Sequence, residues 1–192
     1  MFEIFETYIT ANGVFTPEDL MLMRSLSTVK KVRRKEFLLQ EGEVCRYKIF
    51  IAKGLLKSYR LKDDGTELIM RFASENSWTT DHESFKIQTP SKDNIQALEN
   101  TEVVLWTREN LAKLHTAIPA FKSYMERLVD SGLKASQERI LRILGYSSEE
   151  KYEDFIATFP DVFRRVPLHM VASYLGVSRE TLSRIRQARL KL

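Results

Sequence analysis

The 192-residue sequence contains one cysteine, three histidines and no long uninterrupted apolar run. The single cysteine, Cys45, excludes an intrachain disulfide and an iron–sulfur cluster held by cysteines of this chain alone. No apolar run reaches the length needed to span a bilayer, which argues against a membrane protein. His82, His115 and His169 do not show the spacing of metal ligands, so the sequence predicts no metal site.

Sequence signatures of common enzymes are also missing. The chain has no GxxxxGK[ST], GxGxxG or HExxH motif and therefore no positive sign of an enzyme. Asp81, His82 and Glu83 combine acids with a base, but neighbouring strand residues point to opposite faces, and we interpret the trio as a surface loop. The N-terminal segment carries acids rather than the basic start of a signal peptide, so we expect a cytoplasmic protein.

Basic residues are concentrated at the C-terminal end, although the net charge of the whole chain is only +4. In the segment 162–192 the only acid is Glu180. The same segment contains seven basic residues, namely Arg164, Arg165, Arg179, Arg184, Arg186, Arg189 and Lys191. A basic block of this kind is either a solvated tail or a surface that contacts nucleic-acid phosphates.

The segment 166–186 reads VPLHMVASYLGVSRETLSRIR and predicts a helix-turn-helix motif. Pro167 suits the start of the first helix, and Gly176 suits the tight turn, where glycine adopts a positive φ at little cost. Ser178 is a favourable N-cap for the second helix. Small and apolar residues at helical spacing form the inner side of both helices, namely Val171, Ala172, Leu175, Leu182 and Ile185.

The outward face of the second helix carries side chains that can read DNA. Arginine pairs with guanine, and glutamate accepts a hydrogen bond from the amino group of cytosine. The predicted base contacts are Arg179, Glu180, Ser183 and Arg184. The predicted contacts to the DNA backbone are His169, Ser178, Arg186 and Arg189.

The first 106 residues are predicted to form helices and then a β-roll. Apolar residues recur at helical spacing up to about residue 28, and the segment 16–19, TPED, is a typical helix start. From Val29 to Trp106 short apolar runs alternate with turn residues, and Asp64-Gly65 between two such runs predicts a hairpin. Many short strands at close spacing are typical of a β-roll or β-barrel.

Helical patterns follow. Thr107 is a suitable cap for a short helix to about residue 115, and Pro119 begins a long helix that continues to Gly145. Five residues of the long helix, at spacings of four and three, form a candidate dimer seam, namely Phe121, Met125, Leu128, Gly132 and Ala135. The alternative is that this face packs on the chain's own β-roll.

Further along the long helix, Ile140, Leu141, Ile143 and Leu144 are expected to join the C-terminal core. The chain is thus expected to divide into a β-roll sensor domain (1–106), connecting and dimerisation helices (107–145) and a helix-turn-helix domain (146–192).

This order of elements resembles the Crp/Fnr superfamily of bacterial transcription regulators, named after the cyclic AMP receptor and the fumarate–nitrate regulator. The resemblance covers most of the chain. It is most specific at residues 176–184, GVSRETLSR, which look like the family's recognition helix. The segment 52–65, from Ala52 to Gly65, looks like the family's sensor hairpin.

The resemblance implies an α+β fold with three parts. These are a β-roll like that of cyclic-nucleotide-binding domains, a long dimerisation helix, and a C-terminal helix-turn-helix of the winged-helix type. It also implies that Arg179, Glu180 and Arg184 read bases, and that a homodimer binds a near-palindromic operator in double-stranded DNA. RNA polymerase is then a further expected partner.

The sequence departs from the cyclic-nucleotide-binding members of the family at two places. The region 75–81, ENSWTTD, lacks their Gly-Glu pair, and Ser91 stands where they have an arginine for the cyclic phosphate. A buried phosphate without a compensating charge is costly, so the sequence argues against cyclic AMP. Oxygen sensing of the Fnr type needs several cysteines, which a chain with Cys45 alone does not supply.

An effector is therefore either another small molecule or absent. The candidate lining of an effector pocket consists of Trp78, Thr79, Thr80 and Ser91. For Trp78 itself, packing in the core is the favoured interpretation.

Residues 187–192 follow the core of the recognition helix and are too few for the family's closing β-hairpin, the wing, which would supply phosphate contacts. We expect Arg186, Arg189 and Lys191 to take the place of this truncated wing. The alternative function is an adaptor, in which the β-roll binds a ligand or a protein and the C-terminal domain does not bind DNA. The outward Arg and Glu residues of the second helix favour DNA binding.

Overall fold

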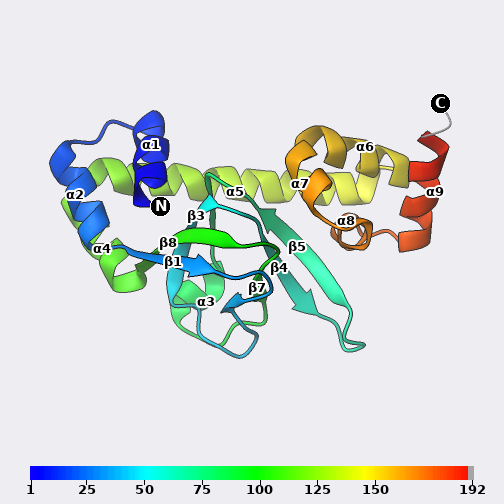
Figure 1. Cartoon of the computed structure of the whole chain (residues 1–192), viewed down its shortest axis with the longest axis horizontal. Helices are drawn as coiled ribbons and strands as arrows, with labels where there is room; N and C mark the ends of the chain where they lie inside the picture. Colours follow the sequence, from blue (N-terminus) through cyan, green and yellow to red (C-terminus); the bar gives the residue numbers. More distant parts are fainter. Residues whose placement is uncertain (190–192) are drawn as a thin grey trace.

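The computed structural model describes residues 1–189, so the phosphate contact expected for Lys191 lies outside the described residues. The long helix α5 (Pro119–Gly145) runs along the molecule and joins its two ends (Figure 1). The N-terminal helices and the β-roll lie along one part of α5, and the C-terminal helices pack around its other end. The fold is α+β, as the sequence predicts.

The N-terminal helices are α1 (Phe2–Asn12) and α2 (Pro17–Ser25). Helix α2 begins where the sequence predicts a start, because Thr16 forms a capping box. Its hydroxyl accepts from the Asp19 N–H (3.1 Å), and the Asp19 carboxylate accepts from the Thr16 N–H (2.9 Å).

Strands in the described part of the chain form two four-stranded antiparallel sheets. The first sheet has the order β1-β8-β3-β6, with β1 (Thr28–Val32), β8 (Thr101–Thr107), β3 (Tyr47–Lys53) and β6 (Ser77–Thr79). The second has the order β2-β7-β4-β5, with β2 (Phe37–Leu39), β7 (Asn94–Ala97), β4 (Leu56–Leu61) and β5 (Glu67–Ala73). The hairpin predicted at Asp64-Gly65 joins β4 to β5.

Alternation along the strands separates the interior of the roll from its outer face. On β3, Ile49 and Ile51 point between the two sheets, whereas Phe50 points outward to the helices. The interior is filled by apolar side chains of both sheets, including Leu39, Leu56, Ile95, Val103 and Leu105. The β-roll is therefore a packed core.

Helices α1, α2, α4 (Arg108–Ala117) and α5 cover the outer face of the first sheet. The cluster between them is aromatic, and Phe5, Trp78 and Trp106 lie within 6 Å of one another by ring centroids. The indole nitrogen of Trp78 donates to the Tyr124 hydroxyl (2.9 Å), which satisfies the polar edge of a buried ring. Helix α4 begins at the cap predicted for it, since Thr107 Oγ1 accepts from the Asn110 N–H.

The dimer seam predicted on α5 is wrong for its first two residues. Phe121 (0 % exposed) and Met125 (6 %) are buried in the aromatic cluster of their own chain. Leu128 packs partly against the same cluster, whereas Gly132 and Ala135 are exposed. Phe121 and Met125 are not available to a partner because the N-terminal half of α5 is covered by the chain's own helices and sheet.

The expectation that four apolar residues near the end of α5 join the C-terminal core is also wrong. Ile140, Leu141, Ile143 and Leu144 are between 39 % and 79 % exposed. The C-terminal helices contact α5 through Arg139 and Arg142, and Ile143 borders the same pocket, but all four apolar side chains stay exposed.

The C-terminal helices are α6 (Ser148–Thr158), α7 (Pro160–Arg165), α8 (Leu168–Leu175) and α9 (Arg179–Arg189). Helix α7 is an addition to the sequence prediction, which ends a helix at Pro160 without starting another. The core of this part combines Tyr152 and Phe155 of α6 with Val162 of α7 and the inner residues of α8 and α9. No helix of residues 1–189 has both the length and the apolar character needed to cross a membrane.

Candidate nucleic-acid interface

Helices α8 and α9 form the predicted pair with a tight turn between them. Gly176 has φ +67° and ends α8 in the left-handed conformation, which favours glycine. The Val177 N–H donates to the Ala172 carbonyl across this turn (3.1 Å). On the other side of the turn, the Ser178 hydroxyl accepts from the Thr181 N–H (3.0 Å) and caps α9 as predicted.

The rotation of α9 about its own axis is set by its buried side. Leu182 (0 % exposed) and Ile185 (6 %) insert among Tyr152, Phe155 and the inner residues of α8. All five residues predicted for the inner side of the motif are buried. Because residues three and four apart share one face of a helix, this packing turns the remaining side chains of α9 to solvent.

The residues predicted to read bases lie on that outward side. Arg179, Glu180 and Arg184 are exposed, and Ser183 is partly exposed. Within residues 1–189 none of the three charged side chains takes part in an ion pair. Their hydrogen-bonding groups are therefore available to a partner.

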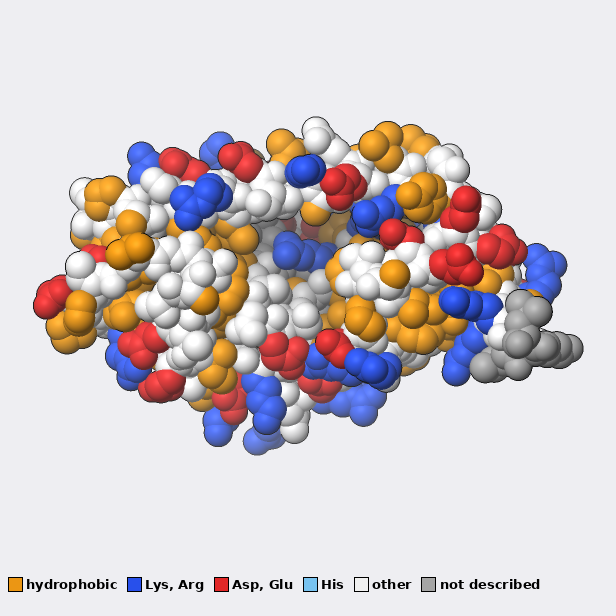
Figure 2. All heavy atoms as spheres, turned by 90° about the horizontal axis from the view of Figure 1, so that it is seen from above, with side chains coloured by type: hydrophobic (Ala, Val, Ile, Leu, Met, Phe, Trp, Pro, Cys, Tyr) orange, Lys and Arg blue, Asp and Glu red, His pale blue; other side chains and the backbone are white. Residues whose placement is uncertain are grey.

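The residues predicted to contact the DNA backbone surround the same end of the molecule. His169 near the start of α8 and Arg186 and Arg189 on α9 are exposed. Figure 2 shows lysine and arginine side chains at the end that carries α9, with acidic side chains beside them. These positions suit contacts with phosphates on either side of a major groove.

Arg164 is predicted from the sequence only as part of the basic block, with no site role of its own. Arg164 and Arg186 line one hollow of about 370 Å³, whose walls also include Val166, Pro167 and Leu168. Arg164 is already paired with Asp161 of the same helix (2.5 Å), so a phosphate bound in this hollow would replace or share that carboxylate. The proximity of Arg164 to Arg186 depends on α7, which places Arg164 beside α9, and therefore needed the tertiary structure.

Arg165 has a different role from the phosphate contact that its place in the basic block suggests. Its guanidinium makes hydrogen-bonded ion pairs with Glu75 (2.8 Å) and Glu99 (2.5 Å), both in the β-roll domain. Hydrogen bonds to Glu75 and then Glu99 raise the pKa of Arg165. This arginine ties the C-terminal helices to the roll.

Helix α8 is also attached to β5. The Ser173 hydroxyl donates to the Glu67 carbonyl (2.6 Å) and accepts from the Ile69 N–H (2.9 Å). A side chain of the first helix of the motif thus continues the hydrogen bonding of β5. The helix-turn-helix and the β-roll are in direct contact.

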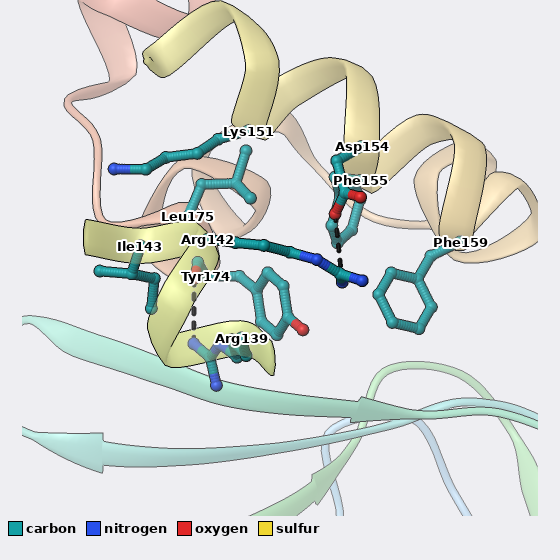
Figure 3. Close-up of a pocket in the computed structure, with 9 residues that line it drawn as sticks. All are labelled: Arg139, Arg142, Ile143, Lys151, Asp154, Phe155, Phe159, Tyr174 and Leu175. Carbon is teal, nitrogen blue, oxygen red and sulfur yellow. Dashed lines mark hydrogen bonds and ion pairs between the residues drawn. The ribbon is translucent and has the colours of Figure 1, made fainter. Parts of the chain in front are cut away.

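Figure 3 shows how α5 holds this junction. The Arg139 guanidinium donates to the carbonyls of Met70 and Tyr174 and lies over the Tyr174 ring, 4.1 Å from its centroid. One turn on, Arg142 pairs with Asp154 of α6 (3.3 Å). A displacement of α5 relative to the roll would therefore act on both α6 and α8.

The four residues predicted for an effector pocket do not line one cavity. Trp78 packs in the outer aromatic cluster, in agreement with the core packing predicted for it. Thr79 pairs with Ile49 and is buried on the opposite side of the strand. Thr80 borders a cavity beside α5. Ser91 is buried and bonds to Asp81, the residue after Thr80. Trp78 and Thr79 separate because successive residues of β6 point to opposite faces.

Ser91 is occupied by a carboxylate of the same chain. Its hydroxyl donates to Asp81 (2.6 Å), whose other oxygen accepts from the Ser84 N–H (3.1 Å). Asp81 is the N-cap of the short helix α3 (His82–Ile87), so the trio at residues 81–83 begins a helix and is not the expected loop. The Asp81 carboxylate thus accepts hydrogen bonds from Ser91 and Ser84. By the resemblance to cyclic-nucleotide-binding members, this is the region where a cyclic phosphate would bind.

The fold and the motif define a class of protein, in which a β-roll is joined through one long helix to a helix-turn-helix. Residues 29–117 match the family described as the cyclic nucleotide-binding domain. The solved structure of FixK2 from Bradyrhizobium japonicum has the same fold, with a TM-score of 0.71 and 19 % identity over 84 % of this chain and 83 % of that one.

Two curated relatives are regulatory proteins. The chain is 27 % identical over 167 residues to the anaerobic regulatory protein of Haemophilus influenzae, covering 81 % of this chain and 64 % of that protein. It is 26 % identical over 167 residues to the fumarate and nitrate reduction regulatory protein of Yersinia pestis, covering 81 % and 66 %. The chain thus spans a little under two thirds of the length of these relatives. These similarities support the resemblance to the Crp/Fnr superfamily that the sequence indicates.

Proposed function

We propose that this protein is a sequence-specific, DNA-binding transcription regulator that works in the cytoplasm and not an enzyme. The observation that carries the proposal is the outward face of α9. Arg179, Glu180 and Arg184 are exposed there without ion pairs in the described chain, on a helix whose opposite side is anchored in a core. The names of the relatives support the same function.

In this proposal the helix-turn-helix contacts both the bases and the sugar-phosphate backbone of DNA, through different residues. Arg179, Glu180, Ser183 and Arg184 read base edges in the major groove. His169, Ser178, Arg186 and Arg189 hold phosphates, together with Arg164 beside Arg186. Residues 1–106 are the sensor domain, 107–145 the connecting and dimerisation helices, and 146–192 the DNA-binding domain.

The proposed assembly is a homodimer formed through α5. The exposed apolar side chains Val129, Leu133, Ile140 and Leu144 recur at intervals of four, seven and four residues and form one stripe along the helix. Pairing of two such stripes would bury them and set two recognition helices about one turn of DNA apart, roughly 34 Å. The operator is then near-palindromic, and RNA polymerase is a further proposed partner.

The proposal is tested by selecting duplexes from a random library with the purified protein at two salt concentrations. We expect the wild type to enrich a two-fold-symmetric motif. Arg184→Ala should relax the preference at one position of each half-site by about 1–3 kcal/mol, because a base contact is lost. Arg189→Ala should weaken all duplexes alike and reduce the salt dependence, because only a phosphate contact is lost.

These two variants control for each other, since both remove one exposed arginine from α9. An unchanged preference in Arg184→Ala would show that another residue reads that base pair. If the wild type enriched no motif at either salt concentration, the adaptor function would be favoured over DNA binding.

We propose that the effector, where one acts, is not cyclic AMP. Asp81 would place a negative charge beside the phosphate, and no arginine stands at position 91 to compensate for it. Calorimetric titration with cyclic AMP at up to roughly 1 mM, the range of very weak binding, should show no saturable heat. Ser91→Arg is the matched variant, and saturable binding by the wild type would contradict the proposal.

A further inference from the structure

A cavity of about 280 Å³ lies outside the β-roll, between the first sheet and the helices α3, α4 and α5. Its apolar walls are formed by Phe85, Leu111, Met125 and Val129. The side chain of Lys48, on β3, also lines the cavity. The cavity is separate from the interior of the roll, which is filled by the apolar residues described above.

Lys48 is on the outer face of the first sheet. It lies opposite Trp106 in the register of β3 and β8, and it is two residues from Phe50, so all three side chains share one side of the sheet. Phe50 and Trp106 belong to the buried aromatic cluster. A lysine on this otherwise apolar face needs a specific reason.

The lysine has no anionic partner in the described part of the chain. Its amine takes part in none of the ion pairs or side-chain hydrogen bonds of residues 1–189, and the like charge of Arg71 disfavours its charged form. Burial, and then Arg71, lowers the pKa of Lys48 to about 8. Partly buried charges are normally paired, so this one is left without compensation.

A second polar group lining the same cavity is also unpartnered. The Nε2 atom of His115, on α4, is buried and has no hydrogen-bond partner within residues 1–189. Burial and the nearby Lys122 lower the pKa of His115, which favours the neutral ring. The cavity therefore presents apolar walls, one cation and one imidazole nitrogen without partners.

We propose that this cavity binds a small aromatic or aliphatic molecule that carries one anionic group, with the anion on Lys48 and the apolar part against Phe85, Leu111, Met125 and Val129. The ligand would replace the missing charge partner and fill the apolar space. Glu126 and Asp130 border the cavity from α5, but both side chains are exposed and neither pairs with Lys48. Because solvent and salt screen these two exposed carboxylates, they do not compensate the charge of Lys48, and its amine stays available to an anion.

The site is tested with two fluorescent probes of the same ring system, the anionic 1-anilinonaphthalene-8-sulfonate and the neutral N-phenyl-1-naphthylamine. We expect Lys48→Met to weaken the anionic probe at least 10-fold and to leave the neutral probe within 2-fold, because only the charge contact is lost. Lys86→Met, which removes an exposed lysine of α3, should change neither. Since the charged form of Lys48 is disfavoured in the folded state, its replacement should not prevent folding.

A second pair of variants tests the apolar walls. Phe85→Trp should weaken both probes by filling the cavity, whereas Ile87→Trp, on the same helix α3 and outside the cavity, should not. If Lys48→Met changed the anionic probe no more than Lys86→Met did, or if Phe85→Trp and Ile87→Trp behaved alike, the proposal would be overturned.

A pH titration of the wild type gives an independent readout that needs no variant. Binding of the anionic probe should weaken as the pH rises through about 8, where the free Lys48 loses its charge, and binding of the neutral probe should not. The other titratable or charged groups around the amine are Cys45, Arg71, His82, His115, Glu126 and Asp130. A parallel loss of both probes would overturn the assignment to Lys48.

Any effect of the ligand on DNA rests on the proposed function, whereas the site itself does not, because the probes are measured without DNA. Met125 and Val129 connect the cavity to α5, and α5 holds the helix-turn-helix through Arg139 and Arg142. If the probes bind as expected and operator affinity is unchanged, the site stands and its regulatory role fails. If the probes do not bind, the site fails whatever happens on DNA.

Discussion

Gly54→Ala is expected to destabilise the protein by about 3 kcal/mol or more. Gly54 follows β3 with φ +103°, a conformation that costs other residues about 1–3 kcal/mol. A Cβ there would lie 2.7 Å from the Thr101 Cα and 2.5 Å from its Oγ1. Because the backbone of β8 cannot move aside without disturbing the first sheet, overpacking adds a comparable cost.

The loss is measured by urea unfolding of the two proteins with a common slope. Gly65→Ala is the matched control, since Gly65 also has a positive φ (+78°) but a Cβ there meets nothing within 4 Å. It should cost only about 1 kcal/mol. Equal losses at both sites would mean that the contact with Thr101 contributes little.

The same variant should weaken the junction with the C-terminal helices. The Gly54 N–H donates to the Glu75 carboxylate (2.7 Å), and Glu75 also accepts from Arg165. A shift of the backbone at Gly54 therefore reaches the ion pairs that attach the helix-turn-helix to the roll. Hydrogen exchange in α8 should increase more in Gly54→Ala than in Gly65→Ala.

The double variant Leu133→Glu with Ile140→Glu is expected to be monomeric and to bind a two-half-site operator more than about 100-fold more weakly. A dimer of this variant would bury two carboxylates from each protomer in an apolar seam, which is unfavourable. Once the dimer is lost, each recognition helix binds without the raised effective concentration that the second half-site supplies, which is worth about 10²–10⁴ in affinity. Sedimentation equilibrium and a mobility-shift titration measure the two effects.

Ala135→Glu decides between the two possible seams of α5. Ala135 belongs to the seam predicted from the sequence, but it lies off the exposed apolar stripe of Val129, Leu133, Ile140 and Leu144. We expect Ala135→Glu to remain dimeric. A monomeric Ala135→Glu beside a dimeric Leu133→Glu/Ile140→Glu would reverse the assignment.

Features whose cause lies within a few residues could be predicted from the sequence. Thr16, Thr107 and Ser178 cap helices by bonds to residues three positions on, and Asp64-Gly65 forms its hairpin because the turn chemistry is local. The inner residues of the helix-turn-helix are buried as their spacing predicts. Strand β6 was not predicted as a separate unit, because three residues carry too little periodicity.

Predictions that depended on the packing partner were the ones that failed. Phe121 and Ile140 are both apolar and lie on one helix, yet one is buried and the other is exposed, because the aromatic cluster of the N-terminal helices and the first sheet packs against only the first half of α5. Arg165 and Arg164 are neighbours in one basic run, yet the first is paired with Glu75 and Glu99, which are distant in the sequence.

The sequence by itself determined the succession of N-terminal helices, β-roll, long helix and C-terminal helices, the helix-turn-helix and the residues of α9 that face outward, since each depends on periodicity and caps within one segment. Only the tertiary structure decided which face of α5 is left uncovered, that Asp81 holds Ser91, and that Lys48 borders an apolar cavity without a partner. These features arise where segments that are far apart in the sequence pack against each other. Whether a side chain is buried there, and whether its charge has a partner, depends on the tertiary structure.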